Sequence, residues 1–323
     1  MSKIGFLLTL LVSVLVCLLP AAPAQAQSNH TFVSAAGNDS NNCATVSTPC
    51  RHLANAYAAT AASGEIEVLD PANYGALTIT GPVSIEGHGW ASIAAVSGGA
   101  AITINANTGD NINIIGVVLD GIAIANTTGI QFNGSGGTLT VRDSVIRNFG
   151  VDGITFQPNN TGLSQLFVSN TLTSDNARSG IQIIPTGSGT TTGVLDHVQI
   201  INNNGDAGLH IESEAQTITM TISDSVSANN ARYGIFASSD GGQPVSTMVR
   251  NCTIANNSVG SPNGGGLASF LTGATMRVTR STITGNGGFS WTTVAGGILL
   301  SYADNNIDGN ADTNPAPPTT PYK

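Results

Sequence analysis

Five ionisable side chains stand at matching positions around a glycine that recurs in three successive segments of this sequence. Arg178, Asp206 and Arg232 each lie two positions before that glycine. In the middle segment, His210 lies two positions after the glycine and Glu212 lies four positions after it. A histidine can remove a proton near neutral pH, and an arginine can hold a carboxylate through two hydrogen bonds. The set predicts a catalytic patch that removes the proton beside the carboxylate of an acidic sugar.

The predicted roles differ among these residues. His210 is the candidate base, and Glu212 would orient or assist it. Asp206 would be a poor base, because the flanking Arg178 and Arg232 should lower its pKa while they hold the sugar carboxylate. These roles require the side chains to point outward to solvent. The alternative is a surface ladder in which arginine and aspartate relieve like-charge repulsion and do no chemistry.

Three neighbouring side chains complete the patch as candidate substrate-binding residues. Gln182 and Phe236 have the same offset from their glycines as His210, and Tyr233 directly precedes the third glycine. Aromatic rings offer a sugar a surface on which to stack. The aromatic content of only 5% argues against an extensive sugar-binding groove.

The elements that must position these residues are repeats. A polar landmark closes the first segment of each of seven units: Asp120, Asp143, Asn170, Asp196, Asp224, Asn251 and Arg280. A β-branched residue stands two positions earlier, and we expect its later members to form one buried stack: Val118, Val141, Val168, Val194, Ile222, Val249 and Val278. A glycine followed by Ile or Leu recurs later in each unit, up to Gly297–Ile298, and Ile154, Ile181, Leu209 and Ile235 should form a second stack. Repeats of this size indicate a solenoid, in which each unit buries its apolar face against its neighbours.

Each unit has the pattern of three short strands and not of a helix. Apolar and polar residues alternate around the landmarks, and no unit contains a helical periodicity of ten or more residues. Asparagines between the second and third strands would stack coil upon coil and bond through their side-chain amides: Asn148, Asn176, Asn203, Asn229, Asn256 and Asn286. The sequence therefore predicts an all-β fold, a parallel β-helix.

This pattern resembles the right-handed parallel β-helix repeat of the pectate-lyase-like superfamily over residues 65–310. Residues 31–40 and 48–56 are similar to the start of that fold, where an opening strand and a Gly-Asn/Asp loop lead to a helix that caps the first coil. With Thr48 as N-cap and Pro49 at the first helical position, this helix is expected over residues 49–60. The superfamily includes lyases, hydrolases, epimerases and non-catalytic surface proteins, so the resemblance specifies the fold and leaves the function open.

The N-terminus and the cysteines predict export. A basic start, an apolar run from Ile4 to Leu19 and a small-residue site at residues 24–26 are typical of a cleaved signal peptide, residues 1–26, and less so of a membrane anchor. In an exported chain, Cys43 and Cys50 favour a disulfide over a metal pair, to which His52 would add one ligand at best. We expect a secreted protein, extracellular or periplasmic.

We expect residues 27–64 to form the opening strand, disulfide loop and capping helix, residues 65–310 the β-helix, and residues 311–323 a disordered tail. The predicted function is to bind or act on extracellular polysaccharide or a cell-surface glycan. A non-catalytic surface, matrix or adhesion protein is favoured over a polysaccharide lyase-like enzyme, because the mature chain would keep only Lys323 as a lysine base. No motif indicates a metal, and calcium, which lyases of the family use, stays open as a cofactor. With a net charge of −9, the chain is not expected to bind nucleic acid. No transmembrane anchor is expected after signal cleavage.

Overall fold

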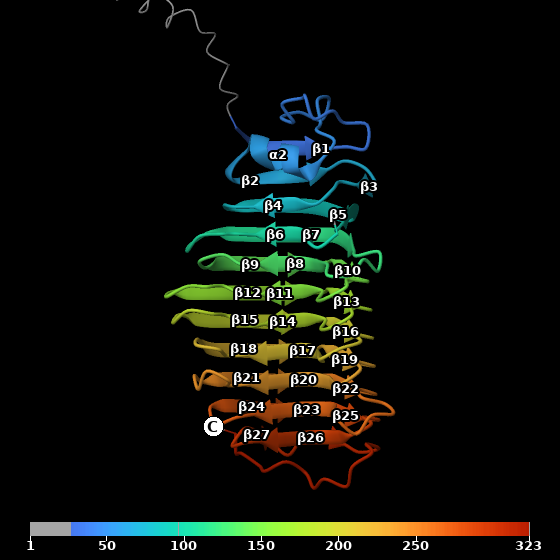
Figure 1. Cartoon of the computed structure of the whole chain (residues 1–323), viewed down its shortest axis with the longest axis vertical. Coiled ribbons are helices and arrows are strands. Elements are labelled where there is room, and N and C mark those ends of the chain that lie inside the picture. The colour runs from blue at the N-terminus through green and yellow to red at the C-terminus, as the bar shows by residue number, and fades with distance from the viewer. Residues whose placement is uncertain (1–26, 96, 323) are drawn as a thin grey trace, which may run out of the picture.

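The computed structural model describes residues 27–95 and 97–322, so the predicted signal peptide lies outside the described residues. The chain winds into stacked coils, with helix α2 (Leu53–Ala59) at one end and strand β26 (Phe289–Val294) near the other (Figure 1). Its strands form one sheet of 19 strands and one of nine, and pairing between coils is parallel. This confirms the predicted all-β parallel β-helix with a capping helix.

The larger sheet supplies two sides of most coils. Its strands are β1 (Ser28–Val33), β2 (Thr60–Val68), β3 (Ala72–Asn73), β5 (Val83–Ala94), β7 (Asn111–Asp120), β9 (Gly137–Arg142), β10 (Val145–Arg147), β12 (Leu163–Ser169), β13 (Leu172–Ser174), β15 (Thr190–Asp196), β16 (Gln199–Ile201), β18 (Thr217–Ser223), β19 (Val226–Ala228), β21 (Val245–Arg250), β22 (Thr253–Ala255), β24 (Ala274–Thr279), β25 (Thr282–Thr284), β27 (Ile298–Ser301) and β28 (Asn306–Ile307). The third side is the nine-stranded sheet of β4 (Leu77–Ile79), β6 (Ala100–Ile104), β8 (Thr128–Phe132), β11 (Ile154–Phe156), β14 (Ile181–Ile183), β17 (Ala207–Glu212), β20 (Tyr233–Ser238), β23 (Gly265–Phe270) and β26. Buried residues alternate with more exposed ones along strands such as β12, because one face of each strand meets the core.

The first apolar ladder lies in the larger sheet and is confirmed with one correction. Its members share one register position and are at most 2% exposed: Ile114, Val141, Val168, Leu195, Ile222, Val249 and Val278. The prediction for Val194 was wrong, because β15 pairs Leu195 with Val168 and leaves Val194 36% exposed. The landmark of that coil is accordingly His197, whose φ of 54° is the left-handed conformation of the bend, and not Asp196.

The second ladder lies in the nine-stranded sheet. It is confirmed for Ile154, Ile181, Leu209 and Ile235, which are at most 1% exposed. Leu267 continues this ladder and Trp291 ends it. The last repeat pair, Gly297–Ile298, does not continue it, because Ile298 lies in β27 of the other sheet and is 46% exposed. At the opposite end, Val118 pairs with Val145, so the first unit is out of register with the later ones.

Asparagines form two adjacent columns at the bend before the nine-stranded sheet, where one column was predicted. In the first column, five successive bonds of 2.8–3.1 Å run from the Nδ2 of one residue to the Oδ1 of the next, and the last residue only accepts: Asn176, Asn203, Asn230, Asn257, Asn286 and Asn310. The residues one position earlier form a second column in the left-handed conformation: Asn148, Asp175, Asn202, Asn229 and Asn256. The amide ladder is confirmed, but Asn148, Asn229 and Asn256 belong to the second column. Asparagine suits both positions, since it also tolerates a positive φ.

Helix α2 covers the end of the first coil, as predicted, but it begins later than expected. Leu53 and Ala56 are buried against the core. The N-cap is His52 and not Thr48, whose hydroxyl donates to Asn42 within the preceding loop. No helix within residues 27–95 and 97–322 is long and apolar enough to cross a membrane.

A disulfide joins Cys43 and Cys50, as predicted. Their Cα atoms lie 5.0 Å apart, within the range that a disulfide can bridge. Both residues are bonded through their backbones to Phe32 of β1, which donates to the carbonyl of Cys43 and accepts from the N–H of Cys50. The loop is thereby tied to the opening strand.

The C-terminal segment lies against the last coil and does not follow the disordered course expected for residues 311–323. The indole Nε1 of Trp291 donates to the carbonyl of Pro315 at 2.9 Å. Ser301 and Thr319 form a parallel bridge further along. A polar, Pro-rich composition suggested disorder, but this segment covers strand edges that the final coil would otherwise leave open.

Candidate functional site

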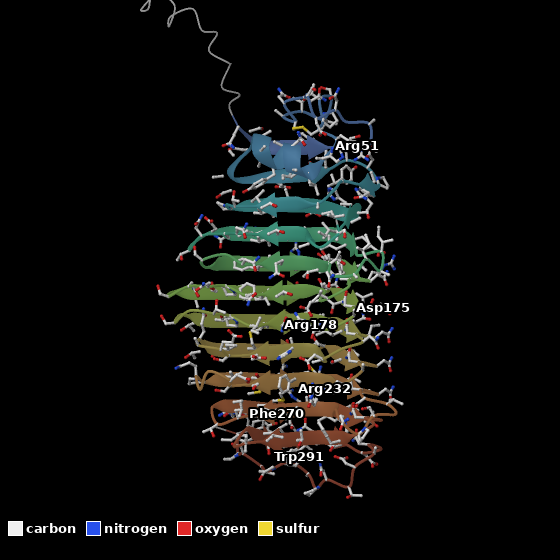
Figure 2. The ribbon with its side chains drawn as sticks, in the orientation of Figure 1. Arg51, Asp175, Arg178, Arg232, Phe270 and Trp291 are labelled. Atoms are coloured by element: carbon white, nitrogen blue, oxygen red, sulfur yellow. A yellow bond between two sulfur atoms is a disulfide. The ribbon has the colours of Figure 1, made fainter. Side chains whose placement is uncertain are left out.

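The residues predicted to form the patch lie on the outer face of the nine-stranded sheet or just before its strands: Arg178, Gln182, Asp206, His210, Glu212, Arg232, Tyr233 and Phe236. In β17, Leu209 and Ile211 point into the core, so His210 and Glu212 point outward at alternate positions. Register places His210 between Gln182 of β14 and Phe236 of β20. Figure 2 shows Arg178, Arg232 and Phe270 along the middle of the molecule, one below another. The three coils therefore bring the predicted residues together.

His210 is buried, contrary to the prediction that it faces solvent. Its side chain is 6% exposed, with Nε2 2.9 Å from Glu212 Oε2 and Nδ1 2.8 Å from Asp206 Oδ2. The Nδ1 contact is an ion pair, since its direction does not suit a hydrogen bond. The Phe236 ring packs edge-on against the imidazole, with centroids 4.8 Å apart. Outward-pointing side chains of adjacent coils are close enough to cover one another, which explains the burial.

The carboxylates determine the charge of this imidazole. Burial alone would lower the pKa of His210, but the contacts with Asp206 and Glu212 outweigh burial and raise the pKa to about 9. His210 is therefore an imidazolium at neutral pH, and neither ring nitrogen is available to accept a proton. This geometry does not favour the role of catalytic base predicted for His210, and Glu212 contacts the imidazolium.

Asp206 has a lowered pKa, as predicted, but for a different main reason. The contact with His210 contributes most, burial opposes it, and Arg232 adds to the lowering. Arg232 Nη1 lies 3.0 Å from Asp206 Oδ1. Only one of the two expected arginines contacts this carboxylate, because Arg178 turns to a different partner.

That partner is Asp152, a residue that the repeat pattern did not single out. Its carboxylate is fully buried and is bound by Arg178 through both Nε, at 2.9 Å from Oδ1, and Nη2. Asp152 also accepts hydrogen bonds from the Ser179 N–H and the Thr155 hydroxyl. The hydrogen bond with Asp152 raises the pKa of Arg178, and Nη2 also donates to Gln182. Asp152 directly precedes the repeat glycine of the coil before that of Arg178. This diagonal relation between the two residues is the sequence signal from which their pairing could have been predicted.

An aromatic cluster adjoins the charged residues on the same face. Tyr233 is nearly buried and stacks on Phe236 with centroids 5.1 Å apart, and the guanidinium of Arg232 lies 4.6 Å from the Tyr233 ring centroid. The half-buried Phe270 meets Phe236 edge-on at 5.0 Å, and Phe289 packs beside Tyr233. Phe270 was missed, although its offset from the repeat glycine equals that of Glu212. The face therefore presents two half-exposed arginines, of which Arg232 lies against a ring.

The cluster as a whole is electrically balanced. Asp152, Asp206 and Glu212 are matched by Arg178, Arg232 and protonated His210. No group of three or more His, Cys, Asp or Glu side chains that could hold a metal occurs in the described part of the chain. The arrangement can bind an anion or a sugar ring at its surface, and it lacks an unengaged base among these residues.

The comparisons with known proteins concern the fold. Residues 128–312, more than half of the chain, match the family described as "Right handed beta helix region". Pectate lyase Pel9A is similar in structure, with a TM-score of 0.55 and 14% sequence identity over 85% of this chain and 68% of that chain. The A-module of the mannuronan C-5 epimerase AlgE4 of Azotobacter vinelandii has a TM-score of 0.45 and 15% identity over 81% and 90% of the two chains. No curated protein matches this sequence. The family match and the likeness to Pel9A confirm the predicted right-handed, pectate-lyase-like fold.

Proposed function

This chain belongs to the right-handed β-helix family, and from that premise we propose that it is exported and binds an acidic polysaccharide on the outer face of its nine-stranded sheet. The observation that carries the proposal is the pair of half-exposed arginines on the face that carries the aromatic cluster, with Arg232 against the Tyr233 ring. Arg178 and Arg232 are 44% and 47% exposed. A relative of the same fold, Pel9A, is named as a pectate lyase, which supports an acidic polysaccharide as the ligand class.

The geometry suits a polymer that lies across several coils. Arg178 and Arg232 stand two coils apart, which corresponds to ~10 Å, or about two sugar residues. A guanidinium can bind a uronate carboxylate through two parallel hydrogen bonds. The exposed edges of Phe236 and Phe270 provide apolar contact for the C–H face of a sugar ring. Glycan binding would use the side chains that the internal ion pairs leave partly free.

Binding is proposed in preference to catalysis. Eliminating a uronate polymer requires a base next to the proton that is removed. His210, the best base by residue type, is already protonated at neutral pH and held by two carboxylates. Glu212 and Asp206 are engaged by the same imidazolium. The cluster therefore favours retention of an acidic chain over its cleavage.

Export is part of the proposal because two features agree on it. The first 26 residues have the composition of a signal peptide. The disulfide between Cys43 and Cys50 is of a kind that persists in oxidising compartments. Mass spectrometry of the protein recovered outside the cytoplasm should find a mature N-terminus near residue 27, and an uncleaved cytoplasmic chain would contradict export.

Arg232 offers the cleaner test of the binding face. Substituting Arg178 would leave the buried Asp152 carboxylate unpaired and would threaten the fold. Arg232→Gln removes one exposed cation whose partner, Asp206, keeps His210. We expect this variant to bind polygalacturonate or alginate at least fivefold more weakly in affinity electrophoresis.

Arg250→Gln is the matched control. Arg250 is 46% exposed and lies 3.9 Å from Asp224, but it belongs to β21 of the other sheet. Both variants lose one charge, so a general electrostatic effect would weaken both equally. Equal retardation of the wild type and Arg232→Gln would contradict the proposed face. Unsaturated uronate products can be monitored by their ultraviolet absorbance, with and without calcium. Their accumulation would show that the protein is a lyase and would contradict a function in binding alone.

A further inference from the structure

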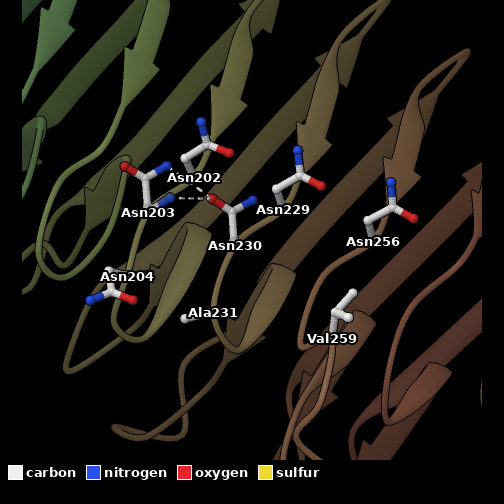
Figure 3. A pocket seen from close by; sticks show the side chains of 8 residues that line it. All are labelled: Asn202, Asn203, Asn204, Asn229, Asn230, Ala231, Asn256 and Val259. Carbon is white, nitrogen blue, oxygen red and sulfur yellow. Dashed lines mark hydrogen bonds between the residues drawn. The ribbon is translucent and has the colours of Figure 1, made fainter.

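A groove follows the outer side of the bend that precedes the nine-stranded sheet (Figure 3). Its larger part encloses about 670 Å³, and its lining includes Asn202, Asn229 and Asn256 together with Ala231 and Val259. A second part of about 350 Å³ also contains Asn202 and extends toward the N-terminal coils. The two parts share Asn202 and Asn204, so they adjoin and together cross successive coils along the solenoid axis.

Three carboxamides repeat along the floor of this groove. Asn202, Asn229 and Asn256 are exposed, and each has the left-handed conformation, with φ of 58°, 56° and 54°. Each backbone N–H donates to a carbonyl of the following coil, which fixes the orientation of the three residues. Within the described residues, none of the three side-chain amides has a hydrogen-bond partner. The adjacent Asn203 and Asn230 contrast with them, because their amides bond to each other (Figure 3).

We propose that this groove binds a neutral, hydroxyl-rich polysaccharide chain laid along the solenoid axis. Each amide offers one acceptor and two donors, which suits the hydroxyl groups of a sugar. The amides recur at ~4.8 Å, the spacing of adjacent strands, so they can contact successive points of an extended polymer. Ala231 and Val259, the latter 71% exposed, provide an apolar wall for sugar C–H groups.

The charge of the groove selects the ligand class. None of the residues that line its larger part is ionisable. Asp175 is the charged residue that lines the second part, and its carboxylate would repel an acidic chain there. A uronate polymer would find no arginine in either part, whereas a neutral polymer loses no favourable contact. This site is separate from the arginine face and does not depend on it.

The left-handed backbone permits a substitution that removes the amides and keeps the fold. Glycine adopts positive φ without strain, and Gly285, with φ of 67°, already occupies the same column. The test is the triple variant Asn202→Gly, Asn229→Gly and Asn256→Gly, compared with the wild type by affinity electrophoresis. The gels contain hydroxyethylcellulose, galactomannan or laminarin as three separate neutral probes. We expect the wild type to be retarded by at least one probe and the dissociation constant to rise at least tenfold in the variant.

Asn170→Gly with Asn251→Gly is the matched control. These residues are also left-handed, with φ of 45° and 51°, but they lie at the other bend of the coil. Their substitution should leave retardation unchanged. Because three glycines could loosen the coils, circular dichroism accompanies each sample, and Asn229→Asp gives a second measurement. This change keeps size and conformation but replaces a donor by a charge, and it should weaken retardation severalfold.

The outcomes separate this site from the arginine face. Arg232→Gln should bind the neutral probes like the wild type, so failure of one proposal leaves the other standing. The groove proposal is overturned if no neutral probe retards the wild type. It is also overturned if the triple variant, or Asn229→Asp where the triple variant does not fold, is retarded like the wild type. Loss of polygalacturonate binding alone in the triple variant would refute the neutral ligand class.

Discussion

Replacing His210 by glutamine tests the charge that its surroundings impose on this side chain. The imidazole is buried between Asp206 and Glu212, whose oxygens lie 2.8 and 2.9 Å from its two nitrogens. Glutamine is of similar reach and can donate to one carboxylate, but it carries no proton that can be gained or lost near neutral pH. The variant should therefore lose stability only where wild-type His210 is protonated.

The magnitude follows from the pKa of about 9, compared with an ordinary value of 6.5. Because the folded state holds the proton more tightly than the unfolded chain, the contribution is complete below about pH 6.5 and is lost as the pH rises through 9. The difference between the two values corresponds to ~3 kcal/mol. The stability gap between wild type and variant should therefore shrink by ~3 kcal/mol between about pH 6 and about pH 10.

Two measurements check this expectation. Guanidinium unfolding at several pH values, followed by two spectroscopic probes because a solenoid need not unfold in one step, gives the stability gap. NMR titration of the imidazole reports the pKa of His210 directly. His197→Gln is the control, since His197 also contacts an aspartate, Asp196 at 2.7 Å, but is 65% exposed and screened by water. A gap that is the same at low and high pH, or an imidazole that titrates near 6.5, would refute the assigned charge.

Three further predictions concern the solenoid itself. Leu195→Asp should unfold its coil by placing an unpaired charge in the core, whereas Val194→Asp should cost less than ~1 kcal/mol; thermal melting of the pair decides between the two registers. Asn230→Ala should cost roughly 2–3 kcal/mol in denaturant unfolding, because its neighbours in the amide ladder lose their partners, and a cost below ~0.5 kcal/mol would speak against the ladder. Cys43→Ser, which opens the short loop to Cys50, should cost roughly 2–3 kcal/mol. Reductant should lower the thermal midpoint of the wild type to that of the variant, and it should leave the midpoint of the variant unchanged.

The repeat could be predicted because the inward positions of a solenoid accept only apolar side chains that stack in register. The same rule could not choose between Val194 and Leu195, since both are apolar and adjacent. The choice depends on which backbone groups pair between β12 and β15, and a difference of one residue moves a side chain from the core to the surface. Asn229 and Asn230 posed the same difficulty, because asparagine suits both the bend and the amide ladder.

The grouping of the patch residues could be predicted, because residues at one offset from the repeat glycine stack in register. The burial of these residues could not be predicted. Register alone brings Gln182, His210 and Phe236 side by side. Burial depends on how side chains from neighbouring coils close over one another, and a pattern of spacings does not contain that information. Asp152 is not at the same offset from the repeat glycine as Arg178 but stands diagonally from it, so equal spacing does not predict this pair.

The spacing of the coils explains why the charged side chains of this face are paired with one another. Side chains at one offset recur at ~4.8 Å, a separation at which unpaired charges of like sign repel strongly and a buried charge must find a partner. Asp152 forms an ion pair with Arg178, and Asp206 forms ion pairs with His210 and Arg232. Each pairing offsets the cost of bringing these charges together and engages a group that could otherwise act on a ligand. A ligand on this face must add contacts without displacing the internal carboxylates, so its affinity depends on the exposed half of each guanidinium. Such contacts are screened by salt, and binding of an acidic chain should weaken as ionic strength rises.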